Sequence, residues 1–238
     1  DQNHFKIESG LDWIAFLFAK NFLRIKCTMD IADYEAWRNV QMEAPIWEKI
    51  NRYQLSFLYT PIPYPAFFDF PSKRESAGYT RLMQISDYLY QKQIQVRGRR
   101  LLDIGTYTGY FAQHFSRIGA KVTAVEYNVS HYELASDINK LLSCNNIELL
   151  NCGIETLSPA RHFEITIMLT VLYWHLHTEL AEKIISVVDQ VTDKYMLWES
   201  GDEAEYEINW ILQHSSFKGY EHISYAHGTG KIRELGCF

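Results

Sequence analysis

Two hydrophobic periods alternate along the second half of the chain. Short apolar runs of strand length recur, and the segments between them carry apolar residues at three- and four-residue steps, the spacing of an amphipathic helix. The runs predict strands over 100–104, 121–126, 146–152, 165–171 and 194–198. The segments between and after them predict helices over 108–119, 130–142, 178–191 and 202–214. Strands that alternate with helices in this way predict a parallel sheet with helices on both of its faces.

The end of the chain changes to a period of two. Ile223–Ala226 alternates apolar and polar residues, a turn with two glycines follows at His227–Gly230, and Lys231–Leu235 alternates again. This pattern predicts a β-hairpin, and therefore antiparallel strands at the end of an otherwise parallel sheet.

The beginning of the chain predicts two helices. Ser9 can cap a helix over 9–27, and Asp30 can cap a second helix, which we expect to be interrupted near Pro45. The first helix carries three basic residues, so contact with a membrane surface is an alternative to docking on the rest of the chain. These basic residues are Lys20, Arg24 and Lys26. We predict that residues 1–71 form an N-terminal helical extension.

A segment rich in proline and aromatic residues closes this extension. Four of the six prolines lie within 61–71. Such dense proline excludes a helix and favours an extended segment, which would be either a wall over a substrate site or a linker wrapped on the domain. The four residues that follow, Ser72-Lys73-Arg74-Glu75, have the pattern of a capping box and predict a helix from there to about Gln91.

The candidate site lies where the first two predicted strands end. Asp103 closes the first strand, Gly105 and Gly109 follow in the turn, and Glu126 ends the second strand. Glycine allows a positive φ and lets the backbone approach a ligand without a Cβ in the way. The amides at the start of the next helix add positive potential, and a carboxylate at the tip of the second strand can accept hydrogen bonds from two ribose hydroxyls. These features predict a nucleotide-sized site.

The side chains in this turn distinguish between nucleotide classes. A dinucleotide-binding turn has the pattern Gly-x-Gly-x-x-Gly, in which the second glycine admits a pyrophosphate. Here Tyr107 and Tyr110 occupy the second and third glycine positions, so a diphosphate would meet side chains. Asp103 would also repel phosphates, whereas it suits a ligand that carries an ammonium and a sulfonium. The turn therefore argues against a nicotinamide-dependent oxidoreductase.

Together these motifs resemble the class I S-adenosyl-L-methionine-dependent methyltransferases, whose cofactor loop contains an acidic residue followed by spaced glycines. The resemblance covers about 97–238. It implies a Rossmann-like, seven-stranded, mostly parallel sheet with a C-terminal antiparallel hairpin, a methyltransferase domain over 72–238, and S-adenosyl-L-methionine as cofactor. The cofactor-binding residues that it implies are Asp103, Gly105, Thr106, Tyr107, Gly109, Glu126, Tyr127, Ile154, Glu155, Leu169, Thr170 and Arg74. Arg74 would meet the methionine carboxylate, and Arg81 is a second candidate for that contact.

The same resemblance places the methyl acceptor beside the loop that follows the fourth strand. Tyr173 and Trp174 would face it, and His175 is the candidate general base that removes the acceptor's proton. The alternative for His175 is a structural role, in which it caps the next helix or holds the loop. His175, His177 and Glu179 would point in different directions on a helix or strand, so we expect no metal site.

Composition sets limits on partners and compartment. The net charge of −6 argues against a protein that binds nucleic acid mainly through phosphates, while a short contact to RNA stays open. The four cysteines show no C-x-x-C spacing and no signal-peptide pattern is visible, so we expect a reducing, cytoplasmic location. The most apolar early run, 13–19, is too short to span a bilayer. We expect the basic cluster Arg97–Arg100 to be solvated, at the sheet edge opposite the ligand.

We therefore expect in-line transfer of a methyl group to an oxygen or nitrogen atom of a small polar molecule or saccharide. An acceptor hydroxyl would need a base such as His175, whereas a neutral amine would not. The aromatic-rich surroundings would let flat or sugar-like acceptors stack. Two alternatives stay open: binding of the cofactor or a partner without turnover, and methylation of RNA or protein.

Overall fold

A computed structural model describes residues 31–238, with the exception of 76, 77, 79 and 229. The helix that we predict over 9–27 lies outside the described residues. No helix in the described part of the chain is both long enough and apolar enough to cross a membrane.

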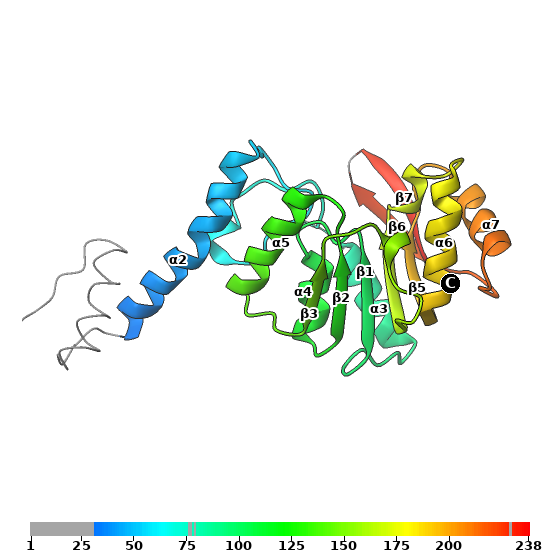
Figure 1. Cartoon of the computed structure of the whole chain (residues 1–238), viewed down its shortest axis with the longest axis horizontal. Helices are drawn as coiled ribbons and strands as arrows, with labels where there is room; N and C mark the ends of the chain where they lie inside the picture. The colour runs from blue at the N-terminus through cyan, green and yellow to red at the C-terminus, as the bar shows by residue number, and fades with distance from the viewer. Residues whose placement is uncertain (1–30, 76–77, 79, 229) are drawn as a thin grey trace, which may run out of the picture.

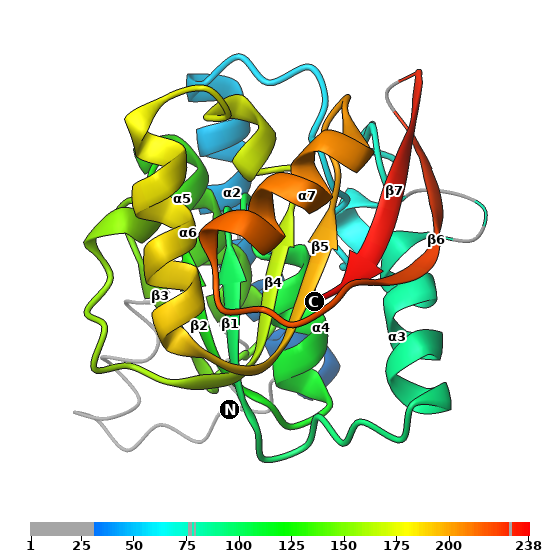
Figure 2. The ribbon, with the colours of Figure 1, turned by 90° about the vertical axis from the view of Figure 1, so that its right-hand side faces the viewer.

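The described residues form a seven-stranded sheet with the strand order β3-β2-β1-β4-β5-β7-β6. The strands are β1 Arg100–Ile104, β2 Lys121–Val125, β3 Ile147–Leu150, β4 Phe163–Leu169, β5 Thr192–Glu199, β6 Glu221–Gly228 and β7 Lys231–Cys237. Strands β1 to β5 are parallel to one another, whereas β7 runs antiparallel to both β5 and β6. Figure 2 shows β6 and β7 at the edge of the sheet. The mostly parallel sheet and its C-terminal hairpin are therefore confirmed.

Helices cover both faces of this sheet, as predicted. The α-helices are α2 Ile31–Arg52, α3 Arg81–Gln91, α4 Tyr110–Arg117, α5 Val129–Leu141, α6 Glu179–Val191 and α7 Ala204–His214. Three short 3₁₀ turns are η1 Pro65–Phe67, η2 Ile154–Thr156 and η3 Leu172–Trp174. Successive side chains of a strand point to opposite faces, and β1 shows this directly. Leu101 packs in a core with α3 and α4, and Leu102 packs in a core with α6 and α7.

The second predicted helix differs from our expectation at Pro45. We expected an interruption there, but α2 continues through Pro45 to Arg52. Proline removes one backbone donor, yet Ile46 and Ile50 on either side of the next turn are both buried in a third core, against α5. Packing of this face outweighs the local preference of the proline. Figure 1 shows α2 extending away from the sheet on the α5 side.

The capping-box prediction is wrong. Helix α3 begins at Arg81, and its N-cap is Thr80, whose hydroxyl accepts a hydrogen bond from the Met83 amide at 3.3 Å. The Glu75 carboxylate instead binds the Arg81 side chain and the Leu82 amide. Glu75 therefore does not take part in a capping box but pairs with Arg81, six positions later. The predicted end of the helix at Gln91 is confirmed.

The proline-rich segment follows an irregular path over α2 and α5. It contains one 3₁₀ turn, η1, where we expected only extended chain. Phe67 of this turn is buried and stacks on Trp47, with ring centroids 4.7 Å apart. The segment joins α2 and α5 in a common core, and a parallel bridge between Leu58 and Ser72 closes its two ends.

Candidate functional site

The candidate site lies at the carboxyl ends of the central parallel strands. Asp103 is near the end of β1, Glu126 follows β2, Leu169 ends β4 and Glu199 ends β5. Parallel strands bring their carboxyl ends to one edge of the sheet, which is where ligands bind in open α/β folds. Of these four residues, Asp103, Glu126 and Glu199 are almost completely buried.

The turn after β1 depends on its glycines. Gly105 has a φ of +67°, and a Cβ at this position would lie 2.9 Å from Val171 Cγ2. Gly109, with a φ of +88°, is the N-cap of α4, and a Cβ there would meet the Gln113 side chain at 2.6 Å. The amides of Gly105 and Thr106 both donate to the Val125 carbonyl, which ties the turn to β2. This turn brings exposed backbone at Gly105 to the edge of the sheet.

Asp103 is held by the beginning of the next helix. Its carboxylate accepts a hydrogen bond from the Thr106 hydroxyl at 2.6 Å and another from the Ala112 amide. Burial raises the pKa of Asp103 to about 6, although these two hydrogen bonds act in the opposite direction. A carboxylate with this pKa is ionised at neutral pH, and a nearby cation would stabilise that form.

Glu126 is oriented by backbone amides on both sides. Its Oε2 accepts from the Tyr107 amide at 2.8 Å and its Oε1 accepts from the Asn128 amide at 2.9 Å. Asn151 holds the backbone of the same residue, because its side-chain amide donates to the Glu126 carbonyl. A carboxylate offers about four acceptor positions, so two remain for the neighbouring hydroxyls of a ribose. The side chain is thus fixed in a conformation that fits this use.

Tyr107 connects the turn to the N-terminal extension. It has a φ of +55°, which is uncommon for a residue with a side chain. Its hydroxyl accepts a hydrogen bond from the Tyr59 amide at 3.2 Å, and its ring lies 4.4 Å from that of His131. The neighbouring hydroxyls of Thr60 and Thr108 are 3.3 Å apart. Residues just before the proline-rich segment therefore form one wall of the loop.

Arg74 lies away from any helix, in a buried cluster of charges. Its guanidinium binds the Glu199 carboxylate and donates to the Tyr59 hydroxyl at 3.1 Å. Arg81 binds the other oxygen of Glu199 at 2.7 Å and also binds Glu75. Burial lowers the pKa of Arg81, but the two carboxylates raise it further, so the net shift is upward. Arg74 and Arg81 thus lie close together at the sheet edge and both pair with Glu199, and the contact of either with a methionine carboxylate stays a prediction.

The remaining predicted cofactor residues lie around this edge in different environments. Ile154, in η2, is buried in the core with α6, whereas Glu155 is exposed. Tyr127 is 75% exposed directly after Glu126. Leu169 ends β4, and Thr170 leaves the strand with a φ of +55° while its amide donates to the Glu199 carbonyl.

His175 closes η3 and holds the loop through its backbone. Its carbonyl accepts from both the hydroxyl and the amide of Thr178, at 2.6 and 3.0 Å. Within the described residues its imidazole makes no hydrogen bond or ion pair. The backbone contacts agree with the structural alternative, and the role as general base stays a prediction.

Two charged residues that the sequence did not single out lie near Tyr173. A Cβ at Gly201 would be 2.2 Å from the Tyr173 side chain, so the ring rests on this glycine, and the Arg233 guanidinium lies 5.0 Å from the ring centroid. Glu207 accepts from the Gly201 amide at 2.7 Å, and burial raises its pKa to about 7. The position of Arg233 depends on the antiparallel pairing of β7 with β5, for which the sequence around it carries no local signal.

Comparison with known proteins shows similarity at the level of the fold. No family model and no curated sequence matches the chain. The magnesium protoporphyrin IX methyltransferase ChlM from Synechocystis PCC 6803, solved with bound SAM, is similar with a TM-score of 0.56 and 17% identity over 66% of this chain and 76% of that one. The precorrin-6y C5,15-methyltransferase of Geobacter metallireducens GS-15 gives a TM-score of 0.51 and 12% identity over 70% of this chain and 92% of that one.

WbdD, a bifunctional kinase-methyltransferase, is similar over a larger part of this chain. One of its structures gives a TM-score of 0.61 and 18% identity over 81% of this chain, which spans 45% of the WbdD chain. The names of these three proteins describe different methyltransferases. What they share with this chain is the arrangement of the sheet and helices.

Proposed function

We propose that this chain, which has the fold of the class I methyltransferases, is an S-adenosyl-L-methionine-dependent methyltransferase. The observation that supports the proposal most is the pair of buried carboxylates, Asp103 and Glu126, on either side of the glycine turn. The similar solved structures are methyltransferases with different substrates, which supports methyl transfer in general. We further propose an oxygen or nitrogen nucleophile on a small polar molecule or saccharide.

The residues at the sheet edge fit this cofactor. Glu126 retains acceptor positions for two ribose hydroxyls, because only two of its positions are used by backbone amides. Asp103 offers negative charge to the cationic part of the cofactor and would repel a diphosphate. Tyr107 occupies the position at which a dinucleotide-binding turn needs glycine.

The reaction that we propose is an in-line displacement. The bound cofactor supplies a methyl group already activated on a sulfonium, so the protein needs no covalent nucleophile. The task of the chain is to hold the acceptor atom in line with that methyl group, and positioning can contribute about 7–11 kcal/mol at best. The fixed conformations of Asp103 and Glu126 serve this purpose on the cofactor side.

The loop after β4 is the proposed acceptor side. Tyr173 is held against Gly201 and Arg233, and the neighbouring Trp174 is 71% exposed. The ring centroids of Tyr173 and Trp174 lie 4.5 Å apart, and adjacent aromatic rings with an exposed face suit a sugar-like or flat acceptor. His175 is the proposed base for a hydroxyl acceptor, since it is partly exposed on the same loop.

Binding without turnover is the second candidate. Both oxygens of Glu126 already accept backbone amides, and Arg74 and Arg81 are both paired with Glu199. A site whose charges are satisfied by the protein itself is stable without a ligand. Charges that pair with one another stabilise the fold and leave no charged group free for a reaction, which supports a chain that binds the cofactor or a partner without turnover.

Equilibrium binding tests the cofactor. We expect S-adenosylhomocysteine to raise the thermal midpoint of the protein and to bind in calorimetry, whereas NAD should do neither. Binding of NAD in preference to S-adenosylhomocysteine would contradict the proposal.

Turnover tests the reaction. The protein is incubated with S-adenosylmethionine labelled in the methyl group and a fractionated extract of small molecules. Label that moves into a small polar product supports the proposal. At low cofactor concentration Glu126→Ala should slow this transfer by about tenfold or more, because the variant binds the cofactor less tightly. If S-adenosylhomocysteine binds but no label moves, the second candidate is favoured, and label in RNA or protein would correct the acceptor class.

A further inference from the structure

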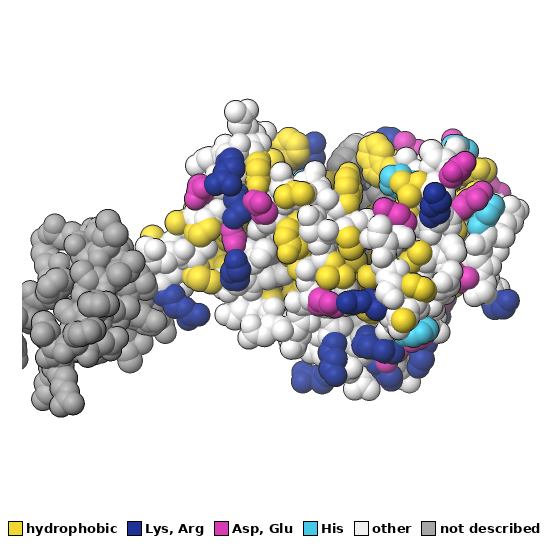
Figure 3. Space-filling view, viewed as in Figure 1, with side chains coloured by type: hydrophobic (Ala, Val, Ile, Leu, Met, Phe, Trp, Pro, Cys, Tyr) yellow, Lys and Arg dark blue, Asp and Glu magenta, His cyan; other side chains and the backbone are white. Residues whose placement is uncertain are grey.

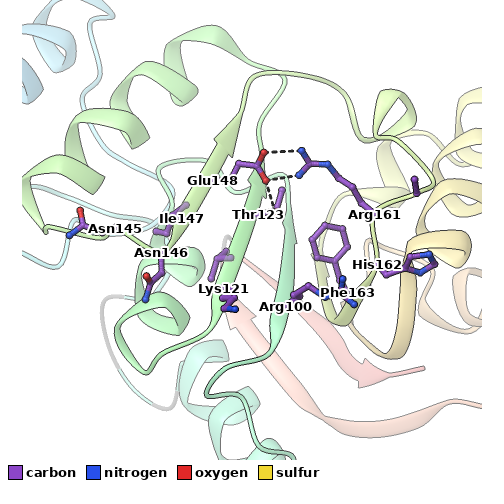
Figure 4. Close-up of a pocket in the computed structure, with 12 residues that line it drawn as sticks. Arg100, Lys121, Thr123, Asn145, Asn146, Ile147, Glu148, Arg161, His162 and Phe163 are labelled. Carbon is purple, nitrogen blue, oxygen red and sulfur yellow. Dashed lines mark hydrogen bonds and ion pairs between the residues drawn. The ribbon is translucent and has the colours of Figure 1, made fainter.

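A groove lies at the opposite edge of the sheet, where the parallel strands begin. It has a volume of about 580 Å³ and is lined by residues at the starts of β1, β2, β3 and β4. Figure 4 shows that Arg100 and Lys121 come from neighbouring strand starts. Arg161 reaches across the top of the groove from the loop before β4. The groove is separate from the cofactor site, because the two sites lie at opposite ends of the same strands.

The groove exists because the connection between β3 and β4 is short. Residues 151–162 contain only the 3₁₀ turn η2, where a crossover between parallel strands usually contains an α-helix. The beginning of this sheet face is therefore without a helical cover. A single 3₁₀ turn can cover only the far ends of β2 and β3, where Val125 and Leu150 join the core with α6.

The side chains that β2 and β3 present to this groove are polar, whereas Phe163 at the start of β4 is apolar and buried. Along β2, Val122 and Ala124 point into the core with α4, whereas Lys121 and Thr123 point to the other face. Thr123 donates to Glu148 of β3 at 3.1 Å, on that same face. A strand buried on both faces would carry apolar residues at these positions. The sequence of β2 thus provides a polar floor for the groove.

Positive charge dominates the lining. Arg100, Lys121 and Arg161 contribute three positive charges against the one negative charge of Glu148, although the chain as a whole has a net charge of −6. Figure 3 shows Lys and Arg side chains gathered along the lower edge of the molecule. The groove is therefore a basic site on an acidic protein.

These cations differ in how far they are neutralised. Arg161 forms a bidentate pair with Glu148, at 2.5 and 2.8 Å. Arg100 forms two longer ion pairs, with Glu164 and Asp193, each at 3.6 Å and so beyond hydrogen-bond distance, and its side chain is 54% exposed. The Lys121 residue is exposed, and its side-chain ammonium makes no hydrogen bond or ion pair with any residue that the structure describes, although its backbone amide donates to the Arg99 carbonyl. Lys121 and Arg100 thus have donors available for an anion.

We propose that this groove binds a small organic phosphate, with Lys121 and Arg100 as the residues that contact the phosphate group. Guanidinium and ammonium groups are the usual phosphate-binding side chains. The carboxylate of Glu148 and the amide of Asn146, which also line the groove, suit the hydroxyls of a sugar-like remainder. The volume lies in the range of about 300–1,000 Å³ that is usual for small-molecule sites, which favours a metabolite over a macromolecule.

Direct binding measurements on the full chain test this site without any methyl transfer. The probes are glucose 6-phosphate, inorganic phosphate and glucose. Binding of each probe is measured by amide chemical-shift changes and by calorimetry. We expect the phosphate ester to bind and to shift the amides of 121–123 and 145–148, inorganic phosphate to bind more weakly, and glucose not to bind.

Two lysine variants give the control. Lys121→Gln removes the unpaired cation and should weaken glucose 6-phosphate binding by about tenfold or more, as expected for one charge-assisted hydrogen bond. Lys218→Gln removes an exposed lysine outside the groove and should leave this affinity unchanged. Both affinities are measured without any methyl-donor cofactor, so the result does not depend on the proposed function, and far-ultraviolet circular dichroism checks that both variants are folded.

Three results would overturn the proposal. One is the absence of any phosphate-ester binding at millimolar concentration, and another is binding that Lys121→Gln and Lys218→Gln affect equally. The third is sedimentation with vesicles that contain anionic phospholipid, lost in Lys121→Gln, without any binding of the free ester. That last result would assign the groove to a lipid headgroup.

Discussion

The two edges of the sheet differ in the burial of their charged side chains. At the carboxyl edge, Arg74, Arg81 and Glu199 are at most 3% exposed, and their charged groups are paired with one another. At the amino edge, Arg100 and Arg161 keep a third or more of their side-chain surface in solvent. The paired charges of the carboxyl edge are therefore buried, whereas the cations of the amino edge are exposed.

This difference determines what each edge can bind. Buried charges lose their hydration on folding, so they must be held in place by partners, and they can position a ligand without rearrangement. Exposed cations remain hydrated and attract anions over a distance that salt screens. The carboxyl edge is therefore suited to chemistry that needs fixed geometry, and the amino edge to reversible capture of an anion. Four predictions test this contrast, in order of decreasing effect.

The buried charge cluster should give the largest effect on stability. Glu199→Gln leaves the guanidinium groups of Arg74 and Arg81 without their shared carboxylate in a site that excludes water. Breaking a buried pair from one side costs about 3–5 kcal/mol. Urea unfolding should show this loss, while Asp193→Asn, which removes a solvated partner of Arg100, should change the free energy of unfolding by less than about 0.5 kcal/mol. Equal effects of the two substitutions would refute the contrast.

Asp103 should make stability depend on pH at the carboxyl edge. Its pKa is raised from 3.8 to about 6 in the folded protein, so the folded state binds its proton more tightly than the unfolded state. Its contribution to stability is therefore fully present below pH 4 and is lost as the pH rises through 6, a change of about 3 kcal/mol.

The measurement for Asp103 is urea unfolding between pH 4 and pH 8. Asp103→Asn cannot ionise, so its stability relative to the unmodified protein should increase with pH over this range. Glu207, whose pKa is also raised by burial, titrates in both proteins and cancels in the difference. If the difference in free energy of unfolding between the two proteins stays constant across this range, the pKa of Asp103 is not raised by folding.

Glu126 should affect ligand binding at the carboxyl edge alone. Loss of a charge-assisted hydrogen bond costs about 1.5–3 kcal/mol, so Glu126→Ala should weaken S-adenosylhomocysteine binding by about tenfold to a hundredfold. Calorimetry provides the comparison with Glu148→Ala, which removes a carboxylate at the amino edge and should leave this affinity unchanged. Unchanged affinity in Glu126→Ala would remove this residue from the cofactor site.

The sequence predicted the elements that depend on local patterns. Both ends of each of the five parallel strands lie within two residues of the expected bounds, and the hairpin of β6 and β7 pairs around its predicted turn. The hydrophobic pattern of a strand or hairpin lies within a few consecutive residues, so it predicts the element without information from the rest of the chain. The positions of Asp103 and Glu126 at the strand ends follow from the same pattern.

The sequence did not predict features that depend on distant partners. Arg74 leaves the expected helix because it binds Glu199, which is 125 residues later. Helix α2 continues through Pro45 because α5 packs on the turn that follows it. In contrast, the alternation of Lys121 and Thr123 with Val122 and Ala124 was available in the sequence as a signal of the groove. Strands of a parallel sheet are usually covered on both faces, so this alternation alone does not predict a groove.

The smallest effect should come from the pair between Arg161 and Glu148, which provides the sharpest comparison between the edges. This pair is bidentate, like an ideal salt bridge, but its side chains are 37% and 49% exposed. Solvent screening limits such a pair to about 0.2–1 kcal/mol. A double-mutant cycle with Arg161→Gln and Glu148→Gln should give a coupling energy in that range by urea unfolding. The same cycle for Arg81 and Glu199 should give several times more, because those side chains are buried; equal coupling energies would mean that burial does not separate the two edges.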